Sequence, residues 1–278
     1  MVGGTSGADA RPRVVRETQH FGRIIVVGGG CYGSYYVRQL GRALQSGAAT
    51  WTELIVVDRD PACRVALLPA DERPRGLRVE TAPWDAFFGD YLARAANDAG
   101  DVAHDAIVPS PLMPHLMAQW LFARSAARWP LRHVAVEALE TAPDVPWQRA
   151  GDDGTHYVSF AEWMCPINCI EPQRCPATKG ERTWSMPPAL AAYVARERDA
   201  GRELEGPFVF QCVHRTHGVG MIDVRRVVEA DQEIAQRGAA GSAAFLVGTV
   251  SHCHGALQRI VVGNATVPSR TSTGDISG

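Results

Sequence analysis

The sequence has few lysines and no marked excess of either charge. Lys179 is the only lysine among 28 basic residues, which face 30 acidic residues for a formal net charge of −2. A mechanism that uses a lysine amine therefore has one candidate. Proteins that bind the phosphate backbone of nucleic acids carry a surplus of Lys and Arg. We therefore expect a small-molecule substrate and no nucleic-acid partner.

Long apolar runs and several catalytic motifs are also absent. No window of about 18 or more apolar residues occurs, so the sequence predicts no transmembrane helix and no membrane association. Residues 1–9 lack a basic segment followed by an apolar one, which predicts no secretory signal and a cytoplasmic location. Gly-x-Ser-x-Gly, the P-loop and His-Glu-x-x-His are missing, so the corresponding hydrolases and phosphotransferases have no support.

The apolar pattern predicts an alternation of strands and helices. The chain has 278 residues, and its hydrophobic content of 46% is ordinary for a folded protein. Short apolar runs predict strands, and longer periodic segments predict helices. In chain order, the expected strands are 24–27, 54–57, 77–79, 106–108, 133–136, 207–211 and 244–250, with helices after 33 and over 84–96, 112–127, 188–198 and 222–236. This order predicts an α/β fold with one extended, doubly wound, mostly parallel sheet of the Rossmann-like type.

Composition divides the chain further. Residues 1–20 are polar and aperiodic, which predicts a disordered N-terminal arm, and 263–278 predict a flexible tail. Prolines, glycines and acidic residues break the alternation over 143–154. We therefore expect a dinucleotide-binding domain over 21–145. A Cys/His-rich α/β region over 146–262 would be an extension or a small second domain. The sequence is compatible with a homo-oligomer.

A glycine-rich turn follows the first expected strand. Gly28, Gly30 and Gly33 have the spacing Gly-x-Gly-x-x-Gly between a buried strand and a helix, and Cys31 lies inside the turn. The first glycine permits a tight turn, the second lets the backbone approach a pyrophosphate, and the third allows close packing of helix and strand. The N-terminus of the helix adds free N–H groups and a positive dipole end. The turn therefore predicts a site for the phosphates of a nucleotide.

The segment over residues 23–140 resembles the N-terminal half of the NAD(P)-binding Rossmann family. The glycine turn and Asp58, at the end of the second expected strand, carry this resemblance. The resemblance implies that Gly28, Gly30, Gly33 and Asp58 bind the dinucleotide, with Asp58 on the ribose hydroxyls. A carboxylate there would repel a 2′-phosphate, which favours NAD over NADP. A methyltransferase would use a similar turn for S-adenosylmethionine.

The cysteines predict a metal site. Cys165, Cys169 and Cys175 lie within eleven residues, in a segment stiffened by prolines. Three thiolates aimed at one point can hold zinc or an iron–sulfur cluster, although the spacing matches neither ferredoxins nor zinc ribbons. Cys212 and Cys253 each follow an expected strand and are further candidate ligands. Buried free cysteines and loop histidines also occur without a ligand, so a structural role is the alternative.

The same two strand ends carry histidines. Cys212 begins a segment with His214 and His217, and Cys253 lies between His252 and His254. If the two strands are parallel, both segments emerge at the carboxyl edge of the sheet, where α/β proteins bind ligands. His217 or His254 would then handle a proton near neutral pH.

Together these features predict an NAD(P)-dependent oxidoreductase with a Cys/His metal site beside the nucleotide cleft. Two alternatives remain open. A protein with the same sites could sense nucleotide or redox state without catalysis, and an S-adenosylmethionine-dependent methyltransferase would share the fold.

Overall fold

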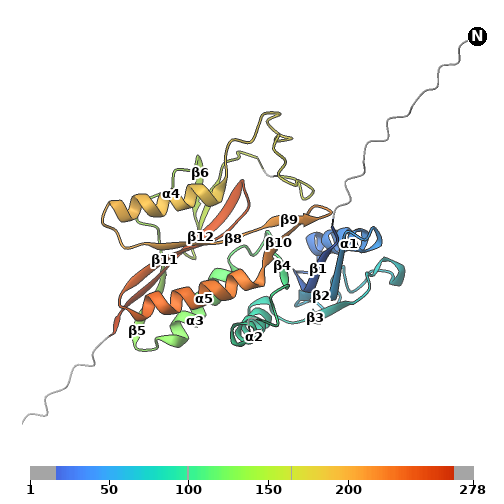
Figure 1. Ribbon diagram of the computed structural model, residues 1–278, viewed down its shortest axis with the longest axis horizontal. Helices are drawn as coiled ribbons and strands as arrows, with labels where there is room; N and C mark the ends of the chain where they lie inside the picture. Colours follow the sequence, from blue (N-terminus) through green and yellow to red (C-terminus); the bar gives the residue numbers. More distant parts are fainter. Residues whose placement is uncertain (1–16, 99, 164, 266–278) are drawn as a thin grey trace, which may run out of the picture.

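The computed structural model describes residues 17–98, 100–163 and 165–265. In these residues the chain forms five α-helices and twelve strands, which build a mixed α/β fold with two mixed sheets (Figure 1). The helices are α1 (Cys31–Gln45), α2 (Trp84–Asn97), α3 (Leu116–Arg128), α4 (Met186–Asp199) and α5 (Val224–Ala239). The strands are β1 (Gln19–Val27), β2 (Ala49–Asp58), β3 (Leu77–Thr81), β4 (Ala106–Val108), β5 (Arg132–Glu137), β6 (Trp147–Ala150), β7 (His156–Ser159), β8 (Glu205–Gln211), β9 (Val213–Thr216), β10 (Val219–Asp223), β11 (Ala243–Val250) and β12 (His254–Ala265).

The first sheet has the predicted parallel pairing at one edge and antiparallel pairing at the other. Its strand order is β3-β2-β1-β4-β10-β9. β1 pairs in parallel with β2 and β4, and β2 pairs in parallel with β3. β10 then pairs antiparallel with β4, and β9 antiparallel with β10. The α/β class is thus confirmed, whereas the parallel arrangement ends at β4.

The second sheet has the order β6-β7-β12-β11-β8, and β5 also pairs with β12. Only β8 and β11 run parallel in it. The prediction of one extended sheet is therefore wrong. The strand predicted near 133–136 does not extend the first sheet beyond β4 but joins β12 instead. An apolar run identifies a strand, while the partner of that strand depends on packing between distant parts of the chain.

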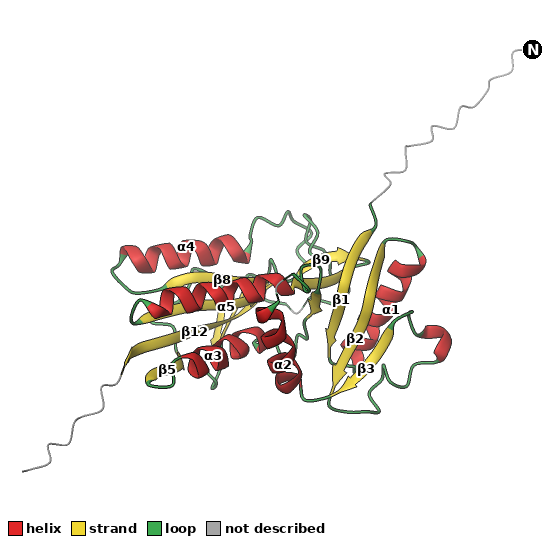
Figure 2. Cartoon of the chain, turned by 60° about the horizontal axis from the view of Figure 1, so that its bottom comes forward, coloured by secondary structure: helices red, strands yellow, loops and turns green. Residues whose placement is uncertain are grey.

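Helices cover both faces of each sheet. α4 lies on one face of the second sheet, and α3 and α5 lie on the opposite face (Figure 2). Strand β11 shows why both faces are covered, because its side chains alternate between two cores. Leu246 belongs to the core under α4, whereas Phe245 and Val247 belong to the core under α3 and α5. Full burial of such a side chain stabilises the fold by about 1.5–3 kcal/mol.

The core under α3 and α5 also joins the two sheets. It includes Phe88 and Leu92 of α2 together with Ile25 and Ile55 of the first sheet. The opposite face of the first sheet packs against α1 through Val37 and neighbouring residues. The two sheets are thus held together by continuous apolar packing, which fixes the position of the loops between them.

The predicted divisions of the chain differ from the observed elements. β1 begins at Gln19, inside the expected arm, and β12 extends to Ala265, inside the expected tail. The rest of the arm and tail, residues 1–16 and 266–278, lies outside the described residues. β5 precedes the expected boundary at 145 but belongs to the second sheet, while β9 and β10 follow it and belong to the first. The boundary at 145 therefore does not separate the two sheets.

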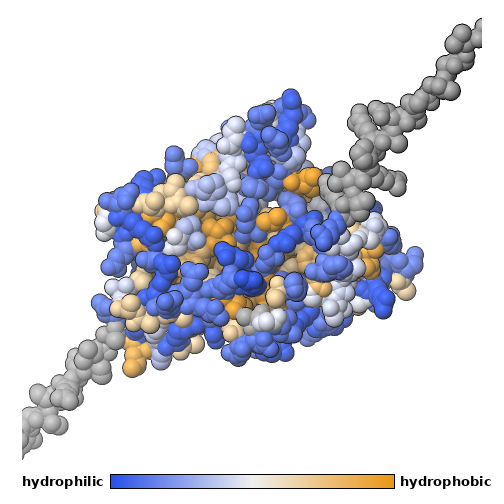
Figure 3. All heavy atoms as spheres, viewed as in Figure 1, coloured by the Kyte–Doolittle hydropathy of each residue, from blue (hydrophilic) through white to orange (hydrophobic). Residues whose placement is uncertain are grey.

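The surface in Figure 3 is mostly hydrophilic at the outer parts of the molecule, and hydrophobic residues reach the surface near the middle of that face. Among the helices of the described segments, none has the length and apolar character needed to cross a membrane.

Candidate functional site

A cavity of about 780 Å³ is lined on one side by α1 and the segment after β4, and on the other by residues between 147 and 171 and the ends of β8 and β11. Tyr32 and Tyr36 of α1 line it together with Leu112, which follows β4. The strand order of the parallel region reverses between β1 and β4, and the crevice at such a switch point is where α/β proteins bind ligands. The facing wall contains Cys165 and His254 from the second half of the chain.

The backbone of the glycine turn requires glycine at two of its three predicted positions. Gly28 has φ +86°, a conformation that favours glycine. A Cβ on Gly33 would overlap the carbonyl oxygen of Gly28, so this position needs glycine for helix and strand to pack. A Cβ on Gly30 would meet open space. α1 begins at the exposed Cys31, and no side chain caps the N-terminus of this helix. The turn therefore leaves a free helix N-terminus beside an open space.

Asp58 fixes the turn from the end of β2. Its Oδ2 accepts the N–H of Gly29 at 2.7 Å, and its Oδ1 accepts the N–H of Asp60 at 2.9 Å. Each carboxylate oxygen has a further lone pair that ribose hydroxyls could use. The loop after β2 also packs on the turn, because Cys63 lies against Gly29 and the N–H of Val65 donates to the Gly29 carbonyl at 3.0 Å. No pattern in the sequence indicates this contact.

The parallel pairing of β8 and β11 brings two predicted segments together. Gln211 is the register partner of Val250, so both strands end at the same edge. Cys212 is the single residue between β8 and β9, and its N–H donates to the Val250 carbonyl at 2.7 Å. Ser251 and His254 line the same cavity from the other strand end. The predicted convergence of the two strand ends is therefore confirmed.

Glu171 attaches the cysteine-rich loop to this edge. Its carboxylate accepts the backbone N–H groups of His252 at 3.2 Å and Cys253 at 3.1 Å. Burial alone would raise the pKa of Glu171, but the hydrogen bonds from Ser251, His252 and Cys253 outweigh burial and hold the pKa below its usual range. An ionised carboxylate is thus built into the wall of the cavity.

Cys165, His254 and Ser159 form a continuous chain of contacts. The His254 Nε2 lies 3.4 Å from the Cys165 Sγ, and the His254 Nδ1 lies 2.8 Å from the Ser159 Oγ. His254 on β12 is the register partner of Ser159 on β7, which explains why their side chains meet. Burial lowers the pKa of His254, and burial with neighbouring Cys169 and Cys253 raises the pKa of Cys165 to about 12. Both side chains are therefore neutral near pH 7.

The other predicted metal ligands lie in different surroundings. Cys169 contacts Cys165, while Cys253 is buried and its Sγ accepts the Trp184 indole N–H at 3.2 Å. Burial raises the pKa of Cys212 to about 12, and its sulfur packs against Gly220.

Cys175 lies in a turn of its own. Its carbonyl accepts the N–H of Lys179 at 2.9 Å, and hydrogen bonds from Thr178 lower the pKa of its thiol. Over residues 17–98, 100–163 and 165–265, no group of three or more His, Cys, Asp or Glu side chains is arranged to hold a metal ion. The predicted set of five cysteine ligands does not gather at one point, and metal binding remains a prediction.

His217 lies away from the cavity. It occupies the exposed turn between β9 and β10 with φ +44°, and its Nε2 lies 3.0 Å from the Ser46 Oγ at the end of α1. Its predicted catalytic role has no support from this position. The histidine of that segment that lines the cavity is instead His214, which lies on β9 three residues beyond the end of β8 at Gln211.

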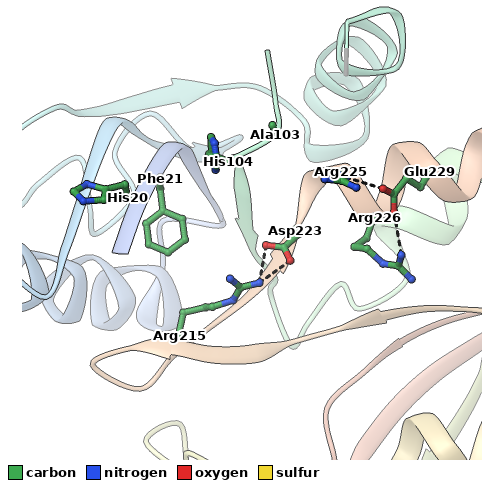
Figure 4. Close-up of a pocket in the computed structure, with 9 residues that line it drawn as sticks. All are labelled: His20, Phe21, Ala103, His104, Arg215, Asp223, Arg225, Arg226 and Glu229. Atoms are coloured by element: carbon green, nitrogen blue, oxygen red, sulfur yellow. Dashed lines mark hydrogen bonds and ion pairs between the residues drawn. The ribbon is translucent and has the colours of Figure 1, made fainter. Parts of the chain in front are cut away.

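A second pocket, of about 340 Å³, contains mostly charged side chains that pair with one another (Figure 4). Arg215 donates to both carboxylate oxygens of Asp223, at 2.7 and 2.6 Å. Arg225 and Arg226 both donate to Glu229, at 2.7 and 3.0 Å. These ion pairs balance much of the charge in this second pocket. None of the predicted site residues lines it.

Sequence reasoning misses several residues of the main cavity. Glu171 stands between Cys169 and Cys175, so an acidic residue inside the densest cysteine segment is the available signal. Ser159 belongs to the β6–β7 hairpin, whose first strand falls in the stretch that breaks the predicted alternation. The sequence indicates Tyr36 only as part of the apolar face of its helix. Its pKa is raised to about 12 by burial and by the neighbouring Cys212.

The fold and cavity define an α/β protein with a glycine turn and a Cys/His-lined cavity at a switch point. A family model described as "Uncharacterized protein, C-terminal domain" matches residues 117–263, which is more than half of the chain. The chain therefore belongs to this family. The match begins at α3 and covers all of the second sheet up to Gly263. Comparisons with curated proteins and with solved structures gave no match.

Proposed function

We propose that this protein is an NAD(P)-dependent oxidoreductase. Its dinucleotide would bind at the Gly28–Gly33 turn, and its substrate would occupy the cavity beside Cys165 and His254. The observation that carries the proposal is the composition of the cavity walls. Tyr32 and Tyr36 belong to the helix that starts at the glycine turn, and they face the Cys/His side of the same cavity. Of the residues within the turn only Tyr32 lines the cavity, so the dinucleotide site that we propose lies next to it.

The residues around the turn fit a dinucleotide. The open space at Gly30 and the uncapped N-terminus of α1 form a cradle that a side chain would fill. Asp58 keeps acceptor capacity for ribose hydroxyls, and its charge disfavours a 2′-phosphate, so NAD is the preferred dinucleotide. A bound nicotinamide would supply the hydride donor or acceptor.

The residues of the chain would orient the substrate and move protons. The Nε2 of His254 faces the Cys165 sulfur, and the Nδ1 of the same ring contacts the Ser159 hydroxyl. The aromatic side chains of Tyr32 and Tyr36 line the cavity from the side of α1. The proposal does not depend on a metal ion, because the cysteines do not gather around a common point in the described residues.

Gly30→Ala tests the dinucleotide site. An added methyl group would meet open space at Gly30, but its φ of −76° and ψ of −144° lie outside the ordinary α and β regions, so a thermal melt of the variant is measured beside its NAD binding. The methyl group would occupy the space that a pyrophosphate needs. We expect wild-type protein to bind NAD more tightly than NADP in isothermal titration calorimetry, and we expect Gly30→Ala to weaken NAD binding by about 10-fold or more.

Gly89→Ala is the matched control, since Gly89 lies in α2 and a Cβ there also meets open space. It should bind NAD as the wild type does. S-adenosylmethionine belongs in the same titration because a methyltransferase would use a similar turn. Binding of S-adenosylmethionine alone, or of no nucleotide at all, would overturn the proposal.

A further inference from the structure

The contacts of Ser159 determine which nitrogen of His254 carries a proton. The Ser159 Oγ donates its only hydrogen to the Ala161 carbonyl at 2.8 Å. Ser159 must therefore accept its hydrogen bond from the His254 Nδ1–H at 2.8 Å. A neutral imidazole with a proton on Nδ1 has its lone pair on Nε2. That lone pair lies on the nitrogen 3.4 Å from the Cys165 sulfur.

The arrangement contains the three parts of an activated nucleophile: a thiol, a base within reach and a group that orients the base. Cys165 supplies the thiol, His254 the base and Ser159 the orienting hydroxyl. All three line the same cavity. The two strands that carry His254 and Ser159 pair directly at these residues, so the base is held by regular sheet structure.

We propose that Cys165 is the catalytic nucleophile of this site and that the substrate is an aldehyde. This inference rests on the proposed function, because an aldehyde carbon bonded to a thiol has a hydrogen that NAD⁺ can accept as hydride. Leu112 and Trp147 line the outer part of the cavity and are 70% and 46% exposed, which suits an aldehyde with an apolar body.

The reaction balances without any further reagent except water. The Cys165 sulfur bonds to the aldehyde carbon while His254 takes the thiol proton and passes it to the carbonyl oxygen, which gives a hemithioacetal. NAD⁺ held at the glycine turn would accept the hydrogen of this C–H bond with its two electrons as hydride, and release of the hydroxyl proton to water would leave a thioester on Cys165. Water, deprotonated by His254, adds to the thioester, and the C–S bond breaks to release the carboxylic acid and restore the thiol. The net reaction converts aldehyde, NAD⁺ and water into carboxylate, NADH and two protons.

The nucleophile can be tested without the dinucleotide. p-Nitrophenyl acetate acylates nucleophilic thiols and releases p-nitrophenol. We expect a burst of one p-nitrophenol per chain and one acetyl group on Cys165, located by peptide mass spectrometry. The burst should vanish in Cys165→Ala, should slow by about 100-fold or more in His254→Gln, and should slow by up to about 10-fold in Ser159→Ala. A thermal melt of each variant shows that it is folded.

Cys175 is the control for this burst, because hydrogen bonds from Thr178 lower the pKa of its thiol and it belongs to none of these contacts. Cys175→Ser should keep the full burst. Acetylation of Cys31 or Cys175 in place of Cys165, or a burst that survives Cys165→Ala, would overturn the inference.

A second measurement separates this inference from the proposed function. NADH formation from NAD⁺ is followed with propanal, hexanal and benzaldehyde in wild type and Cys165→Ala. NADH formed by wild type and lost in Cys165→Ala supports the inference. Acylation of Cys165 and binding of NAD without NADH formation would overturn the aldehyde as substrate. A failure of NAD binding in the Gly30 experiment, with acylation of Cys165 intact, would overturn the proposed function instead.

Discussion

The Glu171 carboxylate accepts the backbone N–H of Cys253 at 3.1 Å and thereby ties the cysteine-rich loop to the end of β11. The same carboxylate accepts the N–H of His252. One side chain of the loop thus accepts two backbone N–H groups just beyond the end of β11, where the pairing with β8 has ended. The position of Cys165 opposite His254 depends on this connection.

Glu171→Gln should loosen the loop. The amide retains one acceptor oxygen but replaces the other with a donor, which faces a backbone N–H. We expect the variant to lose about 1–3 kcal/mol of unfolding free energy in urea denaturation and to be cleaved faster by protease between 165 and 182. Glu162→Gln, an exposed position in the same segment, is the control. Equal stability of both variants would show that Glu171 does not hold the loop.

Gly33→Ala should destabilise the protein, although alanine is the better helix former. Helix propensity alone would favour alanine by about 1 kcal/mol. The added methyl group would overlap the Gly28 carbonyl oxygen, which belongs to the backbone and cannot move aside without displacing β1 or α1. We expect a net loss of about 2 kcal/mol or more in urea denaturation. A variant as stable as wild type would mean that α1 lies farther from the turn.

Glu197 should make stability depend on acid pH. It is 2% exposed, and hydrogen bonds from Arg202 lower its pKa from 4.5 to about 2. A carboxyl whose pKa is lower in the folded state stabilises the fold above the unfolded pKa, and this contribution is lost as the pH falls towards the folded pKa. Glu197→Gln should therefore be less stable by about 2 kcal/mol at neutral pH, and the difference should shrink between pH 4.5 and 2.

Urea denaturation at several pH values measures this difference. Glu203→Gln is the control, because Glu203 is exposed and forms no ion pair with any residue that the structure describes. A gap between wild type and Glu197→Gln that stays constant down to a pH of about 2 would contradict the prediction.

The seven thiols should differ in their rates of alkylation. Cys31 is exposed and the proposed nucleophile Cys165 has a base within reach, so these two should react before the others, whereas Cys63 and Cys253 are buried and should react only when the protein opens. Peptide mass spectrometry after timed labelling of anaerobically purified protein gives each rate. We expect a chelator to leave the labelling of Cys165 unchanged.

Metal analysis of the same sample completes this test. Joint protection of Cys165, Cys169 and Cys175 that a chelator relieves would establish the metal site predicted from the sequence. It would also contradict the proposed role of Cys165 as a free nucleophile.

Sequence patterns predict the parts of the fold that local chemistry determines. The buried strand before Gly28, the glycine turn and the carboxylate at Asp58 follow one another in the chain, so their pattern can be recognised directly. The convergence of Cys212 with His254 is also predictable, because it requires only that β8 and β11 be parallel. The resemblance to the dinucleotide-binding family and the function drawn from it remain predictions.

Other features depend on distant partners and could not be derived. The sequence predicts β5 but not β10, whose last two residues fall in the helix predicted over 222–236, and only packing decides that β5 pairs with β12 and β10 with β4. The separation of Cys175 from Cys165 depends on a turn closed by Gly180 and Lys179, which sequence spacing does not reveal. The contact between His254 and Ser159 requires the β7–β12 pairing across 95 residues.

The connection at Cys212 has a mechanical consequence. Because one residue connects β8 of the second sheet to β9 of the first, the chain has no slack there for the sheets to swing apart. Any change in the width of the cavity would then come from the loops around its opening, such as the segment that carries Cys165. The two sheets would keep their relative position while these loops move.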